Sequence, residues 1–294
     1  MSKRLIIVDS NALLHRAFHA LPPLTTKAGQ ETGAVYGYLL TFFKAIKDLK
    51  PDYVVACFDT KAKTFRHEKF EEYKAQRPVT PSGIVSQIPI TKEVLQSFDV
   101  PVFAKDGFEA DDLIATICKL ASGQEVGLEI YIVTGDLDNL QLVNEKIKVY
   151  TLGRGIKDTV IYDINKVRER FGVEPNQMVD FKALTGDPSD NIPGVEGIGK
   201  KSAAEIIQKY GNIKNLYEEL STDTAVLKPK IKEMLRANKE SALMSRELAK
   251  MKDDVEIDFK IEDCKFKNFD KNKVEEIFRK LEFSSLADRL ESLL

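Results

Sequence analysis

The feature that most constrains the fold is a series of short, continuously apolar segments, rich in β-branched residues, in the first half of the chain. They are Leu5–Val8, Tyr53–Phe58, Val100–Ala104, Ile130–Val133 and Lys148–Leu152. Such segments suit strands of a parallel sheet, because both faces of that sheet are covered. Helical patterns separate most of them, at about Ala34–Leu49, Ile88–Ser97 and Ala110–Ala121. This alternation predicts an α/β fold with a parallel, doubly wound, Rossmann-like sheet.

The pattern changes near Phe181, where the strand signal ends and short helices separated by Gly and Pro take over. We therefore predict a boundary near residues 175–185, with an α/β core over 1–180 and a smaller helical domain over 181–294. A chain of 294 residues is long enough for two domains of ordinary size. Within the second, "DDVEIDFKIEDCKF" predicts an extended stretch and "KVEEIFRKLEFSSLADRLESLL" a closing amphipathic helix.

Composition excludes several classes of protein. Cys57, Cys118 and Cys264 are far apart and form no CxxC pair, which argues against a disulfide framework or a zinc site and suits a reducing cytosol. No stretch approaches the ~20 apolar residues of a membrane span, and the start is too short for a signal peptide, so we expect a cytoplasmic protein. The net charge of -2 does not indicate nucleic-acid binding, so local charge must decide.

Carboxylates follow the ends of four predicted strands. They are Asp9, Asp59, Glu109, Asp111, Asp112, Asp136 and Asp138. Taken alone, the acids of "GFEADDLIA" could simply complement a helix dipole, by roughly 0.3–1 kcal/mol each. Because the carboxyl ends of parallel strands share one edge, however, we expect the whole set to converge there. Like charges in a poorly solvated cleft cannot all ionise without a cation, and oxygen ligands suit Mg²⁺ or Mn²⁺.

A further acidic pair, Asp187 and Asp190, occurs in "GDPSDNIPG". The i, i+3 spacing would put both carboxylates on one face of a helical turn, where they could supply a second cation. The alternative is that Asp187 caps a helix and Asp190 is a turn residue.

The motif "GVEGIGKKSAAEII" comes next, with Gly197, Gly199, Lys200 and Lys201 at a tight turn between helices. Glycine lets the backbone approach a ligand closely, and the free N–H groups of the following helix suit a phosphate. The pattern predicts a helix-hairpin-helix that grips a nucleic-acid backbone without reading bases. A plain helix C-cap is the alternative.

Basic and aromatic residues interleave in "KAKTFRHEKFEEYKAQR". They are Phe65, Arg66, Lys69, Phe70, Tyr73, Lys74 and Arg77. Cations with aromatics suit the phosphates and stacked bases of a single strand, whereas an ordinary solvated helix is the alternative. Two cations held by carboxylates beside Lys and Arg can hydrolyse a phosphodiester, because one lowers the pKa of a water and the other stabilises the leaving oxygen.

Five motifs together resemble the 5′-nuclease domain of bacterial DNA polymerase I, within the flap endonuclease and 5′→3′ exonuclease superfamily. They are "VDSNALLHRAFHALPPL", "KTFRHEKFEEYKAQRP", "GFEADDLIA", "TGDLDNLQL" and "LTGDPSDNIPGVEGIGKKSA". The likeness covers essentially the whole chain. It implies a structure-specific 5′→3′ exonuclease and 5′-flap endonuclease that removes RNA primers and acts in DNA replication and repair.

The resemblance also implies roles for single residues. The ligands or near-ligands of one metal are Asp9, Asp59, Glu109, Asp111 and Asp112. The surroundings of the other are Asp136, Asp138, Asp187 and Asp190. Arg66 and Lys74 contact the scissile phosphate from a helical gateway at about 61–90. The DNA-binding residues are Arg16, Tyr73, which stacks on substrate, Arg77, further along the same helix, and Gly197, Gly199, Lys200 and Lys201 of the hairpin. The hairpin is also where the family binds K⁺.

Two positions depart from the family pattern: Leu137 replaces a basic residue, which weakens local phosphate attraction, and Ser10 replaces Gly. The implied partners are DNA with 5′ flaps, nicks or free 5′ ends, RNA/DNA primer duplexes, and a polymerase domain in the same or another chain. We expect a monomer. A phosphatase-like hydrolase is one alternative, but it needs an Asp where Asn11 stands. A DNA-binding scaffold with a degenerate site is the other, but it would have lost carboxylates.

Overall fold

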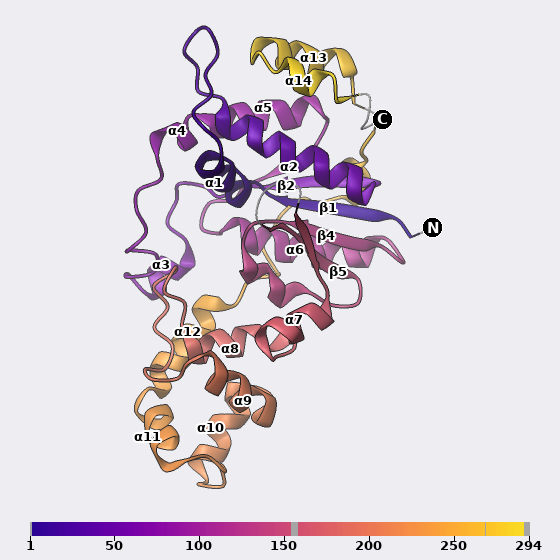
Figure 1. Ribbon diagram of the computed structural model, residues 1–294. Helices are drawn as coiled ribbons and strands as arrows, with labels where there is room; N and C mark the ends of the chain where they lie inside the picture. Colours follow the sequence, from indigo (N-terminus) through magenta and orange to yellow (C-terminus); the bar gives the residue numbers. More distant parts are fainter. Residues whose placement is uncertain (1, 154–157, 268, 291–294) are drawn as a thin grey trace.

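The centre of the molecule is a six-stranded sheet of order β3-β2-β1-β4-β5-β6 (Figure 1). The computed structural model describes residues 2–153, 158–267 and 269–290. The strands are β1 (Arg4–Asp9), β2 (Tyr53–Cys57), β3 (Val102–Phe103), β4 (Glu129–Val133), β5 (Ile147–Leu152) and β6 (Thr159–Tyr162). The strands β1 to β5 pair in parallel. Each of these five coincides with an apolar segment that the sequence predicts as a strand.

The sixth strand, β6, departs from the predicted parallel sheet, because it pairs antiparallel with β5. β6 follows β5 directly in the chain, and a strand that returns without a crossover helix must run antiparallel. Its first three residues are only partly buried. The continuously apolar pattern that identifies the other strands is therefore not required here.

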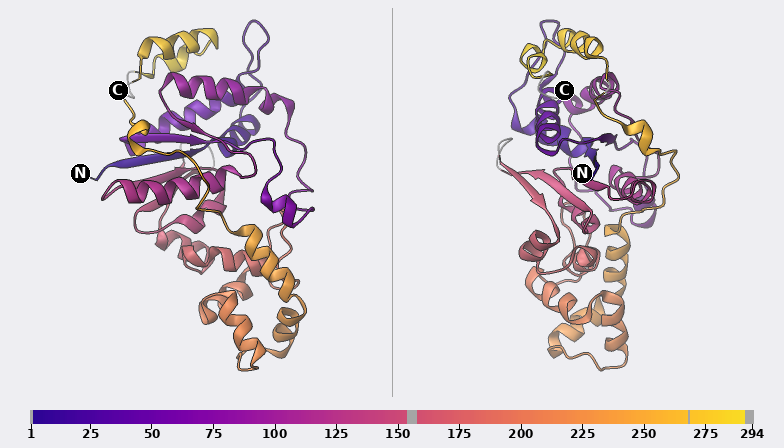
Figure 2. Two further views of the ribbon diagram at one scale, coloured as in Figure 1. Left: turned by 180° about the vertical axis from the view of Figure 1, so that it is seen from behind. Right: turned by 90° about the vertical axis from the view of Figure 1, so that its right-hand side faces the viewer.

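Helices cover both faces of the sheet (Figures 1 and 2). Alternate residues of β1 explain this, since Ile6 and Val8 pack with the helices of one face and Leu5 and Ile7 with those of the other. The first face carries α1 (Ser10–Ala20), α2 (Gly33–Leu49), α4 (Ser82–Val85) and α5 (Gln87–Ser97). The second carries α6 (Ala110–Gln124).

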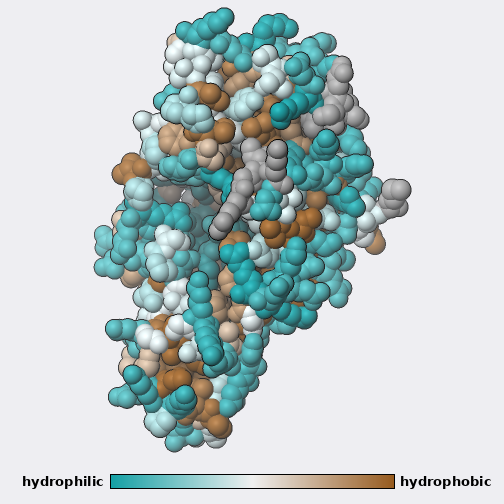
Figure 3. Space-filling model, viewed as in Figure 1, coloured by the Kyte–Doolittle hydropathy of each residue, from teal (hydrophilic) through white to brown (hydrophobic). Residues whose placement is uncertain are grey.

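The chain then continues as a helical part at the lower end of Figure 1. Its elements are α7 (Ile164–Phe171), η2 (Pro175–Gln177), α8 (Met178–Thr185), α9 (Lys200–Tyr210), α10 (Ile213–Ser221), α11 (Pro229–Ala237) and α12 (Lys239–Ala249). Ile207 of α9 and Leu216 of α10 belong to the same apolar cluster as Ile132 of β4, so the core runs without a break from the sheet into these helices. Hydrophilic side chains dominate the face shown in Figure 3, with apolar residues in scattered patches.

The end of the chain returns to the sheet, which corrects the predicted extent of the helical division, 181–294. After the short η3 (Ile261–Cys264), α13 (Lys271–Lys280) and α14 (Ser284–Ala287) pack in the cluster formed by α2 and α5. The extended segment before them bridges Lys265 to Tyr53 beside β2. An amphipathic pattern predicts a helix but does not say which surface it covers. Residues 291–294 of the predicted closing helix lie outside the described residues.

Across the described ranges, none of the helices combines the length and apolar character needed to cross a bilayer.

Candidate active site

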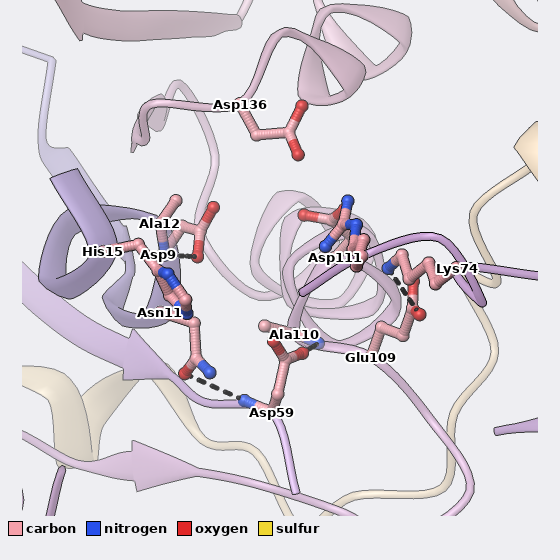
Figure 4. A pocket seen from close by; sticks show the side chains of 11 residues that line it. Asp9, Asn11, Ala12, His15, Asp59, Lys74, Glu109, Ala110, Asp111 and Asp136 are labelled. Carbon is pink, nitrogen blue, oxygen red and sulfur yellow. Dashed lines mark hydrogen bonds and ion pairs between the residues drawn. The ribbon is translucent and has the colours of Figure 1, made fainter. Parts of the chain in front are cut away.

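The site lies at the carboxyl ends of the parallel strands, at the end of β1, which has β2 on one side and β4 on the other. A cavity of about 200 Å³ opens there (Figure 4). Its lining residues are Asp9, Asn11, Ala12, His15, Asp59, Lys74, Arg77, Glu109, Ala110, Asp111 and Asp136. Five of the predicted metal ligands therefore converge, as the strand-end argument expects.

Protein donors orient the carboxylates of the first strands. Asp9 ends β1 and caps α1, because its Oδ1 accepts from the Ala12 N–H at 3.1 Å and its Oδ2 from the Thr134 hydroxyl at 2.6 Å. Asp59 follows β2, and its Oδ1 accepts from the Ala110 N–H at the start of α6, at 2.7 Å. Asp9 and Asp59 are thus each held near the end of a strand by a backbone N–H from the start of a helix.

Four of the acids form no ion pair with any Lys, Arg or His that the structure describes. Within the described part of the chain, the ion pairs of the cleft involve other acids, and none includes Asp9, Asp59, Asp111 or Asp136. Burial, together with the charges of Asp59 and Asp136, raises the pKa of Asp9 to about 7. Burial beside Asp136 and Asp9 raises the pKa of Asp111 well above its ordinary value. Ionising these groups together is costly, and a divalent cation would remove that cost.

The chemistry of these donors fits a hard divalent cation, since all four side chains offer carboxylate oxygens. As they stand, though, no three His, Cys, Asp or Glu side chains among the described residues are grouped to hold one ion. Figure 4 shows Asp9, Asp59, Asp111 and Asp136 around the cavity on separate sides. A shared ion therefore requires side chains to turn inward from their present hydrogen bonds.

The second acidic group is neutralised by protein cations. Lys182 of α8 lies between two of its members, with Nζ 2.6 Å from Asp187 Oδ2 and in contact with Asp138. Burial raises the pKa of Asp138 to about 7 even beside this lysine. Burial by itself would raise the pKa of Asp187, but the Lys182 ammonium lowers it and holds that pKa below its ordinary value. The sequence offers no signal that separates Lys182 from other lysines.

The predicted shared face of Asp187 and Asp190 is wrong. Residues 188–191 form a turn rather than a helix, closed by a bridge between Asp187 and Ile192. Asp187 accepts from the Ser189 N–H at 2.9 Å and faces Lys182, whereas Asp190 faces Lys74. The i, i+3 rule applies only inside a helix.

The predicted helical gateway at about 61–90 is mostly irregular. Its first helix, α3, spans only Phe65–Lys69, and turns follow it, with Lys74 at a left-handed φ of 56°. Tertiary hydrogen bonds replace helical ones: the Lys74 N–H donates to the Asp190 carbonyl at 3.0 Å, and Asn191 Nδ2 to the Glu72 carbonyl at 2.7 Å. The prediction that Arg77 continues the same helix is therefore wrong.

Arg66 and Asp112 do not line the cavity but form a buried ion pair behind it. Arg66 is 2 % exposed and Asp112 0 %. Both contacts, from Nη1 and Nη2 of the guanidinium to the two carboxylate oxygens, measure 2.8 Å. Asp112 also accepts from the N–H groups of Glu109 at 3.0 Å and Lys252 at 2.8 Å. Its acceptors are thus occupied, and one of its hydrogen bonds caps the start of α6 at the N–H of Glu109.

Tyr73, Lys74 and Arg77 connect the gateway segment to Glu109 and Asp190. Lys74 Nζ lies 2.6 Å from Glu109 Oε1, and Arg77 pairs with Asp190. The Tyr73 ring, expected to stack on substrate, is instead buried at 3 % exposure. Its hydroxyl donates toward Glu109 Oε2 at 3.2 Å and Asp190 Oδ2 at 3.0 Å. Lys74 and Arg77 still line the cavity.

The two hairpin glycines differ in backbone conformation. Gly197 has the left-handed φ of +81°, and a Cβ there would clash with the Cε of Met234. Gly199 is the N-cap of α9 with φ −86°, and a Cβ there would meet nothing within 4 Å. Lys200 and Lys201 are exposed at the start of the helix.

A second hollow adjoins the cavity. Arg16, Leu137 and Asp138 line it together with Asp136. The Arg16 guanidinium donates to the Gly153 carbonyl. Leu137 is apolar, so it adds no positive charge to the lining of this hollow. Ser10, the other departure from the family pattern, is buried and shares a hydrogen bond of 3.2 Å with the Tyr38 hydroxyl.

Asn11 and His15 line the main cavity although the sequence reasoning did not select them. Asn11 Oδ1 accepts from the Asp59 N–H at 3.2 Å, so it helps to place the end of β2. Both lie in the first two turns of α1, and their i, i+4 spacing puts them on one face of that helix. That spacing is the signal that could have identified them.

Known proteins resemble this chain along its length. Residues 4–172 match the family described as "5'-3' exonuclease, N-terminal resolvase-like domain", and residues 173–272 match "5'-3' exonuclease, C-terminal SAM fold". DNA polymerase I of Caldicellulosiruptor bescii is 39% identical over 289 residues, which cover 98% of this chain and 33% of that protein. The chain thus spans about a third of the polymerase I relatives that it matches.

A shorter relative matches over nearly its whole length. The 5'-3' exonuclease of Aquifex aeolicus is 38% identical over 291 residues, which cover 99% of this chain and 96% of that protein. Among solved structures, the bacteriophage T5 flap endonuclease in complex with DNA and metal ions superposes with a TM-score of 0.67, at 22% identity and 99% coverage of both chains. The structural likeness extends over the sheet and the helical part alike.

Proposed function

The chain belongs to the 5′-3′ exonuclease family, and on that premise we propose that it is a divalent-metal-dependent, structure-specific 5′ nuclease. It hydrolyses phosphodiester bonds as a 5′→3′ exonuclease and a 5′-flap endonuclease. The observation that carries this proposal is the set of four carboxylates, Asp9, Asp59, Asp111 and Asp136, that meet at one cavity without a cationic partner among the described residues.

Asp9, Asp59 and Asp111 would hold the first cation, Mg²⁺ or Mn²⁺, with Glu109 beside them. Asp136, Asp138, Asp187 and Asp190 would surround the second, once Lys182 has moved from between Asp138 and Asp187. Bound in this way, such ions lower the pKa of an attacking water and stabilise the leaving oxygen. The protein's own part is to hold the scissile phosphate at the cavity. Lys74, at the rim, would meet the charge that develops on it.

Phosphates of the duplex would bind away from this chemistry, at the start of α9. The first N–H groups of a helix have no partner within it, and Lys200 and Lys201 add positive charge there. The proposed substrates are DNA with 5′ flaps, nicks or free 5′ ends, and RNA/DNA primer duplexes, with K⁺ bound at the hairpin. The proposal includes a monomer acting at the nucleoid in the cytoplasm, in replication and repair. A polymerase domain in the same or another chain would be its partner.

The test is a flap duplex labelled at its 5′ end and incubated with low millimolar Mg²⁺ or with EDTA. We expect short 5′ products that depend on Mg²⁺ and are absent for Asp136→Asn, a variant that should still bind the duplex in a mobility-shift assay. Release of free phosphate without shortened DNA would indicate a phosphatase. Binding without any product from the parent protein would indicate a scaffold, and either result refutes the proposal.

A further inference from the structure

One buried polar side chain beside the acidic cavity has no role in the site so far. Asn139 lies in the 3₁₀ helix η1 (Leu137–Leu142) and is 0 % exposed. Its Nδ2 donates to Asp111 Oδ1 at 2.9 Å. Its Oδ1 is buried and, among the residues that the structure describes, has no hydrogen-bond partner.

Charge decides which way this amide points. The reversed orientation would set the amide oxygen against the carboxylate of Asp111, where two acceptors repel each other. The observed orientation therefore keeps the bond to Asp111 and leaves the oxygen of Asn139 buried without a donor, which costs stability. In the same 3₁₀ helix, Leu140 belongs to the buried apolar core, and Leu137 and Leu142, partly buried, pack against it. A leucine of similar volume would avoid that cost, so packing gives no reason for an amide here.

Among the described residues, Asp111 has a single hydrogen-bond donor, as Asp59 does, whereas Asp9 has two. Asp9 accepts from Ala12 and Thr134, and Asp59 from Ala110. Asp111 has one donor among the described residues, and that donor is Asn139. A neutral donor favours the ionised carboxylate and restricts its rotation.

We propose that Asn139 is a positioning residue that holds the Asp111 carboxylate ready to bind the divalent cation. Partners of this kind orient metal ligands, and losing one typically weakens metal binding by about 10–100-fold. The proposal rests on the metal site of the proposed function. It predicts that the amide of Asn139 lowers the stability of the fold while it raises the affinity for metal.

Asn139→Leu separates these two effects. Calorimetric titration of the full chain with Mn²⁺ should show binding at the tightest site weakened by about tenfold or more. Thermal unfolding in EDTA should occur at the parent's temperature or above it. Tyr210→Phe is the matched control, because the Tyr210 hydroxyl is also buried without a partner among the described residues but lies on α9, outside the cavity. This control should raise the unfolding temperature and leave Mn²⁺ affinity unchanged.

Unchanged Mn²⁺ affinity in Asn139→Leu would overturn the proposal. If the leucine variant does not fold, Asn139→Ala removes the same donor without adding volume, and parent-like affinity in that variant would overturn it equally. Cleavage of the labelled flap duplex is measured on the same samples. A parent that binds Mn²⁺ but does not cleave refutes the nuclease function and leaves the role of Asn139 intact. A parent that binds no Mn²⁺ refutes the role of Asn139.

Discussion

Replacing Arg66 by methionine should destabilise the fold strongly, because the guanidinium joins three distant parts of the chain. Two of its nitrogens bond the carboxylate of Asp112 on α6, both at 2.8 Å. Nε donates to the Leu248 carbonyl at 2.8 Å and Nη2 to that of Lys250 at 3.0 Å, at the end of α12. Arg66 itself lies on α3. Loss of the side chain would leave a carboxylate and two carbonyls without these donors.

The size of the effect follows from burial. Removing one partner of a buried ion pair costs about 3–5 kcal/mol, since the other charge stays in a poorly solvated place. Asp112 is 0 % exposed, but it keeps the N–H donors of Glu109 and Lys252, which compensate it in part. We therefore expect Arg66→Met to lower the free energy of unfolding by about 3 kcal/mol, at the lower end of that range. Adding Asp112→Leu should recover only part of the loss, because it removes the unpaired charge but leaves the N–H groups of Glu109 and Lys252 without their acceptor.

The assay is urea denaturation followed by circular dichroism, in EDTA so that metal binding does not contribute. Arg77→Met is the matched control, because the Arg77 side chain is 47% exposed and its ion pair with Asp190 should contribute less than about 1 kcal/mol. For each variant that folds, single-turnover cleavage at saturating flap DNA is measured as well.

A small change in stability would contradict this prediction. If Arg66→Met unfolds within about 0.5 kcal/mol of the parent, the range of ordinary surface substitutions, the buried pair is not a structural link. If the same variant also loses single-turnover rate, Arg66 leaves Asp112 to meet the scissile phosphate, as the family resemblance implies.

Three further predictions concern the cavity and the hairpin. Lys74→Met should lower the single-turnover rate more than the affinity for flap DNA, because Lys74 acts on the charge that develops during cleavage. If only the dissociation constant changes, Lys74 is an outlying phosphate contact instead. The pKa of Asp9 is raised from 3.8 to about 7, so the folded state binds a proton that the unfolded state releases, and stability in EDTA should fall as the pH rises from about 4 to 7. Asp9→Asn should flatten this fall in a series of melting curves, and an equally steep profile in the variant would contradict the assignment. Gly197→Ala should cost about 1–2 kcal/mol in urea denaturation because of its positive φ, whereas Gly199→Ala should fold like the parent but bind every flap duplex more weakly across a salt titration. Equal stability of the two glycine variants would count against the hairpin geometry.

Local sequence was sufficient for the elements whose reasons are local. The five parallel strands are continuously apolar because helices cover both faces, and that pattern can be read without knowing any partner. The convergence of Asp9, Asp59, Asp111 and Asp136 follows from the rule that parallel strands end at one edge, so most of the cavity could be predicted. The motifs also identified the family, which the matches along the chain confirm.

Tertiary structure decided the features that depend on partners far away in the chain. Arg66 looks like other basic residues of its segment, yet it is buried because a carbonyl 182 positions later and Asp112 accept its hydrogen bonds. Lys182 and Asn139 acquire their positions beside the acids in the same way, from packing that no local pattern encodes. Gly197 and Gly199 are alike in sequence, and the turn that joins the two helices determines which of them takes the positive φ. Short-range periodicity specifies which surface of an element is apolar, whereas the choice of contact across the fold depends on the free energy of the whole packed arrangement.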